Sequence, residues 1–177
     1  MKKDDLNKRR HELLLRLEDS LKEDLIPAMT GEPDEETGIE ILNVIFDDMG
    51  FDGEEVLGEF FFTPVTSDED TVQHFSAVLT LRDEIGEEHL PELFEAMSYV
   101  NFSLPCGCYC VDGEKQFLTY KLTVPISTEA SDEVLFEEMN VCMGNALASA
   151  DLYMDLLIKI LDGQATVSHI LESLGAS

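Results

Sequence analysis

The first thirty residues carry leucines at intervals of three, four and seven positions, with charged residues between them. Such spacing places the leucines on one face of a helix, and it predicts an amphipathic helix from Asp5 to about Met29. This helix could pack on its own domain or on a second copy of the chain. The leucines of the predicted stripe are Leu6, Leu13, Leu14, Leu17, Leu21 and Leu25.

An acidic stretch that contains Gly31 and Pro33 follows the predicted helix. Both residue types interrupt helices, so this stretch is the best candidate for a boundary. We therefore expect residues 1–30 to form an N-terminal amphipathic helix, residues 31–37 an acidic linker, and residues 38–177 a single α+β domain.

The next part of the chain changes from helical spacing to strict alternation. Apolar residues at 39–49 are spaced as one face of a short helix, which Gly50 would end. Residues 56–65 and 72–82 alternate between apolar and polar, as strands do, and the polar residues 66–70 between them suit a hairpin turn.

The remaining pattern predicts three helices and two strands. The helices are expected at 87–102, 131–161 and 167–174, and the strands at 106–111 and 115–124. Strands joined by hairpins and separated from helices are typical of an α+β protein with an antiparallel sheet. We expect helices to pack mainly on one face of that sheet and to leave the other face more open.

The two later strands flank Asp112-Gly113, a strong signal for a two-residue hairpin loop. This loop would pair Cys110 with Lys115 and Cys108 with Phe117. Directly paired residues share a side of the sheet, so the cysteines are expected on the polar outer face. A three-residue loop would reverse the assignment. The predicted outer set, a candidate partner-binding or dimer face, is Cys106, Cys108, Cys110, Phe117, Thr119 and Lys121.

The three clustered cysteines also raise the alternative of a thiol or metal-binding site. Alternate residues of a strand are about 6.6 Å apart, so the row would extend over roughly 13 Å, too far to converge on one zinc ion. Cys142 falls on the buried stripe of the long helix instead. Small apolar strand residues are the simpler interpretation. The sequence also lacks a nucleophile motif, a phosphate-binding glycine loop and an EF-hand pattern, so we expect no catalytic residues, no metal site and no cofactor.

Charge narrows the possible partners. The chain has 38 acidic residues against 11 Lys and Arg, giving a formal net charge of −27. A body this negative repels phosphate, which disfavours nucleic acid and anionic membranes as partners. The first residues lack the uninterrupted apolar core of a signal peptide, so we expect a cytoplasmic protein with reduced cysteines. Most basic residues lie in the predicted first helix: Lys2, Lys3, Lys8, Arg9, Arg10, Arg16 and Lys22.

One stretch, MSYVNFSLPCGCYCVDGEKQFLTYKLTVPI at residues 97–126, resembles the YbjN-type bacterial family. The features that carry the resemblance are Asn101, Leu104-Pro105, Gly107, Tyr120-Lys121 and Pro125, and the similarity extends over about residues 36–162. The resemblance implies a fold like that of type III secretion chaperones, with an antiparallel sheet covered by helices on one side. It also implies an acidic, cytoplasmic and often dimeric protein, but it supplies no catalytic residues.

The sequence therefore favours a non-enzymatic, chaperone-like or regulatory module that binds a polypeptide partner or a second copy of itself as a homodimer. The alternative from another class is a thiol or metal-binding protein that uses Cys106, Cys108 and Cys110. A DNA mimic, in which carboxylates imitate phosphates, is a third hypothesis.

Overall fold

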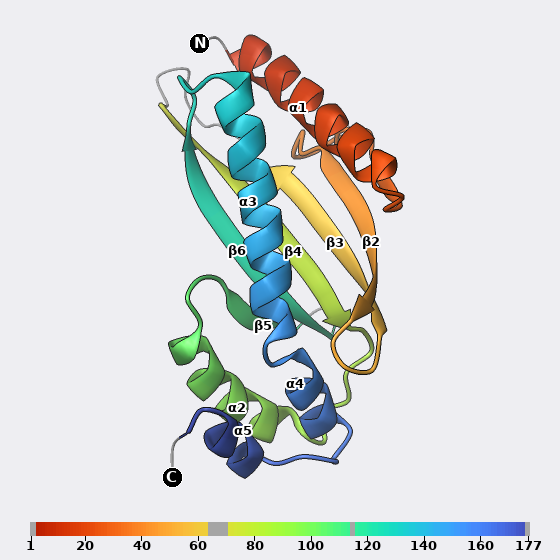
Figure 1. The fold of residues 1–177 in the computed structure, drawn as a ribbon, viewed down its shortest axis with the longest axis vertical. Coiled ribbons are helices and arrows are strands. Elements are labelled where there is room, and N and C mark those ends of the chain that lie inside the picture. The colour runs from red at the N-terminus through yellow and green to blue at the C-terminus, as the bar shows by residue number, and fades with distance from the viewer. Residues whose placement is uncertain (1–2, 64–70, 114–115, 176–177) are drawn as a thin grey trace.

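Six strands form one antiparallel sheet in the order β1-β2-β3-β4-β6-β5, and helices cover mainly one of its faces (Figure 1). The computed structural model describes residues 3–63, 71–113 and 116–175. The α+β class predicted from the sequence is confirmed. The hairpin turn expected at residues 66–70 lies outside the described residues. The elements are α1 (Lys3–Glu23), β1 (Ala28–Thr30), β2 (Ile41–Met49), β3 (Glu54–Phe62), β4 (Val72–Arg82), α2 (Leu90–Ser103), β5 (Cys108–Asp112), β6 (Phe117–Ser127), α3 (Asp132–Asp151), α4 (Met154–Leu161) and α5 (Val167–Ser173).

Helix α1 packs on the sheet beside α3, on the same face (Figure 1). Five leucines of its predicted stripe are buried, and Leu13, Leu14 and Leu17 belong to the same apolar cluster as the inner side chains of the sheet. The helix ends at Glu23 and not near the predicted Met29, so Leu25 lies beyond it and is exposed, and residues 28–30 form β1 instead. Arg9 fixes the helix to the start of α3, because its Nε atom lies 2.5 Å from Asp132 Oδ1 and its Nη1 atom donates to Thr128 O at 2.9 Å. The basic helix thus docks on the acidic body of its own chain.

Residues 39–49 do not form the predicted short helix, because Ile41–Met49 is strand β2. Leu42, Val44 and Phe46 are buried on one side of this strand, which is the alternation of a sheet with one covered face. The other side of the strand also carries apolar residues, Ile41 and Ile45, so the apolar positions together resembled the spacing of a helix. Pairing with β1 and β3 on both sides decides the conformation, and β-branched residues suit it.

The long helix predicted at 131–161 is broken into α3 and α4, which meet at a bend of 48°. Tyr109 of β5 occupies the break: its hydroxyl lies 2.7 Å from the Ala150 carbonyl oxygen, to which it donates, and accepts from the Tyr153 amide at 3.2 Å. The phenol thus replaces main-chain bonds that the helix loses at the bend. Burial strongly raises the pKa of Tyr109, so the hydroxyl keeps its proton.

The same bend bears on membrane insertion. Among the described residues, no helix by itself has the length and apolar composition to cross a membrane, and only α3 and α4 together, across their bend, reach both.

Candidate binding face and thiol pair

The outer face of the sheet, called here the open face, is crossed by none of the described helices (Figure 1). Most of its side chains are half-buried or exposed, although Ser76 is buried. They mix apolar groups and hydroxyls with charged residues such as Glu55, Glu59 and Lys121. Two ladders place Glu59 beside Val78 and Val78 beside Lys121, so one cross-strand row carries an acid, a central valine and a base. The residues at the centre of the open face are Ile45, Leu57, Glu59, Val78, Thr80 and Lys121.

The pairing within the last hairpin differs from the predicted one. Cys108 pairs with Lys121 and Cys110 with Thr119, while Asp112 and Phe117 close a four-residue connection, residues 113–116. The partners are therefore shifted by four residues from those of a two-residue loop. Since an even shift keeps every side chain on its side of the sheet, the predicted face assignment holds for the two strands.

Cys106 is the exception to that assignment, and its expected place in the row is wrong. It precedes β5, and Gly107, with a φ of +66°, turns the chain between them. The Cys106 sulfur consequently lies on the helix side, 3.5 Å from Ser149 Oγ of α3. Cys142 is buried within α3, as its position on the apolar stripe predicted, and burial raises the pKa of its thiol to about 12.

Cys108 and Cys110 form a close pair on the open face. Their sulfur atoms are 3.4 Å apart, because the side chains lean toward each other along the strand. Burial, and next the contact with Cys108, raises the pKa of Cys110 to about 11, against an opposing effect of Lys121. Both sulfurs lie where an approaching ligand could bridge them. Within the described part of the chain, no set of three or more His, Cys, Asp or Glu side chains is grouped to hold a metal ion.

Side chains cap both edge strands of the sheet, a feature that sequence reasoning missed. The Asn101 amide of α2 accepts from Tyr109 N at 2.7 Å and donates to Tyr109 O at 3.0 Å, as a neighbouring strand would. At the other edge, Glu18 of α1 accepts from Thr30 N at 2.7 Å. Natural proteins protect edge strands in this way, and strand addition is therefore disfavoured at these positions.

The electrostatics at Glu18 suit this capping role. Burial by itself raises the pKa of Glu18, but hydrogen bonds from Lys22 and Thr30 outweigh burial and lower it. The carboxylate therefore stays ionised as an acceptor. Asn101 already stood out in the sequence as part of the family resemblance, whereas Glu18 carried no signal, because only the folded chain brings it to β1.

Comparison with known proteins gives a likeness in fold alone. No family model matches the chain, and no curated protein matches it. The crystal structure of YbjN from E. coli is similar with a TM-score of 0.42 and 13% sequence identity, over 79% of this chain and 92% of that one. An uncharacterized protein from Methanothermobacter thermautotrophicus is similar with a TM-score of 0.44 and 14% identity, over 86% of this chain and 98% of that one. Membership of the bacterial YbjN-type family stays a prediction.

Proposed function

We propose that this chain is a non-enzymatic, cytoplasmic protein-binding module, chaperone-like or regulatory, whose binding surface is the open face. A second copy of the same chain is the occupant that we assign to this face. The open face carries both an acid and a base, Glu59 and Lys121, beside apolar side chains such as Leu57 and Val78, which suits an interface between two copies. The capped sheet edges support face-to-face packing over strand addition.

The row of Glu59, Val78 and Lys121 carries this proposal. If two copies pack face to face about a twofold axis parallel to β4, Val78 meets the second Val78. Each Glu59 then faces the Lys121 of the other copy, because the axis exchanges the strands on either side of β4. The row is thus self-complementary, as an isologous interface requires. Complementary charges give such an interface its specificity and register.

Charge reversal tests this arrangement. In the variants Glu59→Lys and Lys121→Glu, like charges face each other twice in each dimer, so we expect each to weaken self-association about tenfold or more. The double variant restores opposite charges and should recover the wild-type dissociation constant. Sedimentation equilibrium at fixed ionic strength measures all four proteins.

An equimolar mixture of the two single variants provides a further control. The lysine introduced at position 59 of one chain would then face the glutamate introduced at position 121 of the other, so the mixture should form heterodimers more readily than either variant forms homodimers. A wild-type chain that stays monomeric at high concentration, or a double variant as weak as the singles, would argue against the second copy as occupant.

The close thiol pair supports a second candidate function, binding of a thiophilic ligand. Two sulfurs 3.4 Å apart are near the separation of about 3.8 Å that two thiolates take on one tetrahedral ion with bonds of about 2.3 Å. Bound ligand would displace both thiol protons. Because the raised pKa of Cys110 keeps its thiol protonated at neutral pH, binding should strengthen as the pH rises. The Cys106 sulfur lies on the helix side of the sheet, beside Ser149, so Cys106 is not part of this candidate site.

Phenylarsine oxide is a suitable probe, because its oxygen leaves as water when arsenic forms bonds to two neighbouring thiols. The wild-type chain should bind one arsenical and lose two titratable thiols. Cys108→Ser and Cys110→Ser should each abolish this uptake, whereas the control Cys106→Ser should leave it unchanged. Uptake that persists in Cys110→Ser, or none in the wild type, would eliminate the thiol pair as a ligand site.

A further inference from the structure

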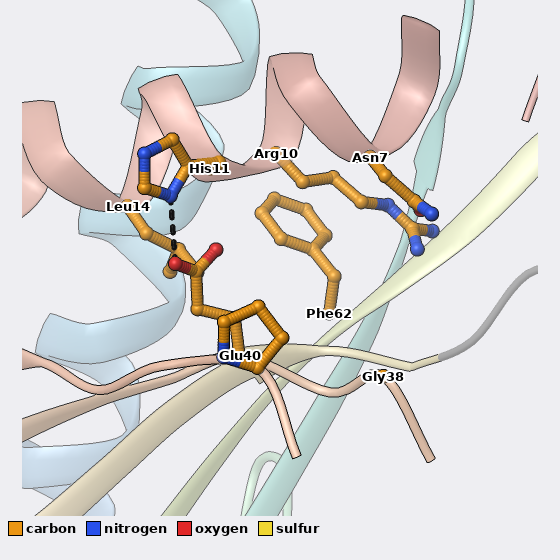
Figure 2. Close-up of a pocket in the computed structure, with 8 residues that line it drawn as sticks. Asn7, Arg10, His11, Leu14, Gly38, Glu40 and Phe62 are labelled. Carbon is orange, nitrogen blue, oxygen red and sulfur yellow. Dashed lines mark hydrogen bonds and ion pairs between the residues drawn. The ribbon is translucent and has the colours of Figure 1, made fainter. Parts of the chain in front are cut away.

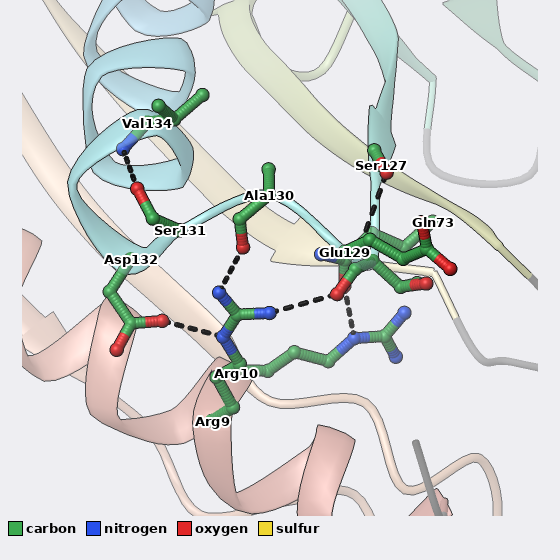
Figure 3. Close-up of polar contacts among 10 residues, drawn as sticks. Arg9, Arg10, Gln73, Ser127, Glu129, Ala130, Ser131, Asp132 and Val134 are labelled. Carbon is green, nitrogen blue, oxygen red and sulfur yellow. Dashed lines mark hydrogen bonds and ion pairs between the residues drawn. The ribbon is translucent and has the colours of Figure 1, made fainter.

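Arg10 of α1 is a buried cation that has no acidic partner among the described residues. The residue is only 7% exposed, and no carboxylate of the described residues forms an ion pair with it. Its Nε atom donates to Gln73 Oε1 at 2.9 Å (Figure 3). Its guanidinium lies 5.2 Å from the centre of the Phe62 ring. Burial lowers the pKa of Arg10 to about 10, which still leaves it charged at neutral pH.

Two donors at this place lack acceptors. Arg10 Nη2 and Gln73 Nε2 are both buried without a hydrogen-bond partner in the described structure. A buried donor without an acceptor costs free energy, and a buried unpaired charge costs more. Arg9, the preceding residue, shows the contrast, since it has a carboxylate and main-chain carbonyls as acceptors (Figure 3). Within the part of the chain that the structure describes, Arg10 therefore has no anion as a partner.

A pocket lies beside this cation. Its cavity of about 290 Å³ is formed where α1 faces the segment before β2 and the end of β3. Figure 2 shows the Arg10 guanidinium next to the Asn7 amide at one end of the pocket. The His11–Glu40 pair lies at the other end, and the Phe62 ring lies between the two ends. His11 Nδ1 lies 2.6 Å from Glu40 Oε1. Leu14 and Pro33 add apolar surface to the walls.

We propose that this pocket binds a carboxylate group attached to an apolar body. The oxygens would accept from the guanidinium of Arg10 and the amide of Asn7, and the apolar part would lie against Leu14, Pro33 and Phe62. Arginine and carboxylate form strong charge-assisted hydrogen bonds. Glu40 places a negative charge in the same pocket, so a monoanion is preferred to a phosphate dianion. The carboxylate belongs either to a small organic acid or to the C-terminus of a peptide.

Calorimetry with benzoate tests the small-acid source, and a short peptide ending in phenylalanine tests the other. We expect benzoate, or the peptide with a free C-terminus, to bind with a dissociation constant of about 1 mM, in the range for a ligand of this size. Benzamide and the C-terminally amidated peptide have the same shape without the charge, and they should bind at least about tenfold more weakly. Inorganic phosphate should compete poorly.

Variants locate the site. Arg10→Met should abolish binding of the carboxylate probe, whereas Arg16→Met should not, since Arg16 also stacks on an aromatic ring of this chain but is exposed outside the pocket. Asn7 is exposed at the pocket, so Asn7→Leu preserves folding and should weaken binding about threefold or more even if Arg10→Met fails to fold. The proposal is overturned if neither carboxylate probe binds, if phosphate binds more tightly, or if Asn7→Leu and Arg10→Met both bind like the wild type.

Discussion

Replacing Leu17 by alanine should lower the free energy of unfolding by about 2–5 kcal/mol, the usual effect of truncating a buried leucine. Leu17 is fully buried in the cluster that α1 shares with the sheet and α3. The truncation removes apolar surface and leaves a cavity that the neighbouring side chains fill only partly. Urea unfolding followed by circular dichroism measures the change, and an unaltered m-value would show that the denatured state is unaffected.

Leu15, on the same helix, is the matched control. Its side chain is 39% exposed, so Leu15→Ala should change the free energy of unfolding by less than about 1 kcal/mol. If both variants were equally stable, α1 would not be seated on the core in solution. The pair therefore tests whether residues 1–30 fold as part of the domain or as a separate helix.

Gly107→Ala should destabilise the protein by at least about 2 kcal/mol, because alanine rarely adopts the left-handed backbone conformation found there. The φ angle of Gly107 is +66°, and an added Cβ atom would lie 2.3 Å from Tyr120 Oη and 2.8 Å from Lys121 O. The second contact is with main chain, so no change of rotamer relieves it. We expect the hairpin to distort and the hydrogen bond from Tyr120 Oη to Cys106 O to be lost.

Gly144→Ala in α3 is the opposite case and serves as control. An added Cβ atom there would meet nothing within 4 Å, and the residue is exposed in the interior of the helix. Alanine should therefore stabilise the protein, by about 0.5–1 kcal/mol. Thermal unfolding of both variants gives the comparison. A neutral Gly107→Ala would mean that the turn before β5 is more adaptable than the structure indicates.

Local pattern was sufficient for much of the fold. The leucine stripe of α1 and the alternation of β3 and β4 each repeat a single period along the chain. The sequence therefore predicted correctly that the first is a helix and the other two are strands. The side of the sheet that faces the core also followed, because a register shift of four leaves the parity of every strand residue unchanged. The exact pairing of β5 with β6 could not be predicted, because the four-residue connection after Asp112 depends on the hydrogen bonds along both strands.

The errors lie where distant contacts overrule local spacing. Residues 39–49 carry apolar side chains on both sides of a strand, so their spacing resembled a helix and predicted one. Pairing with β1 and β3 makes this segment a strand instead. The break between α3 and α4 depends on Tyr109, a residue of β5. Cys106 leaves its expected row because Gly107 turns the chain.

The sequence by itself determined the α+β class, the helical first segment and the side of the sheet on which Cys108 and Cys110 lie, because each depends on the spacing of neighbouring residues. The tertiary structure decided the features on which the proposals rest. It brought Glu59 and Lys121 to either side of Val78, and it capped the sheet edges with Glu18 and Asn101. It also buried Arg10 with no acid of the described residues beside it. These features join residues that are far apart in the chain, and only packing fixes such distances and burial.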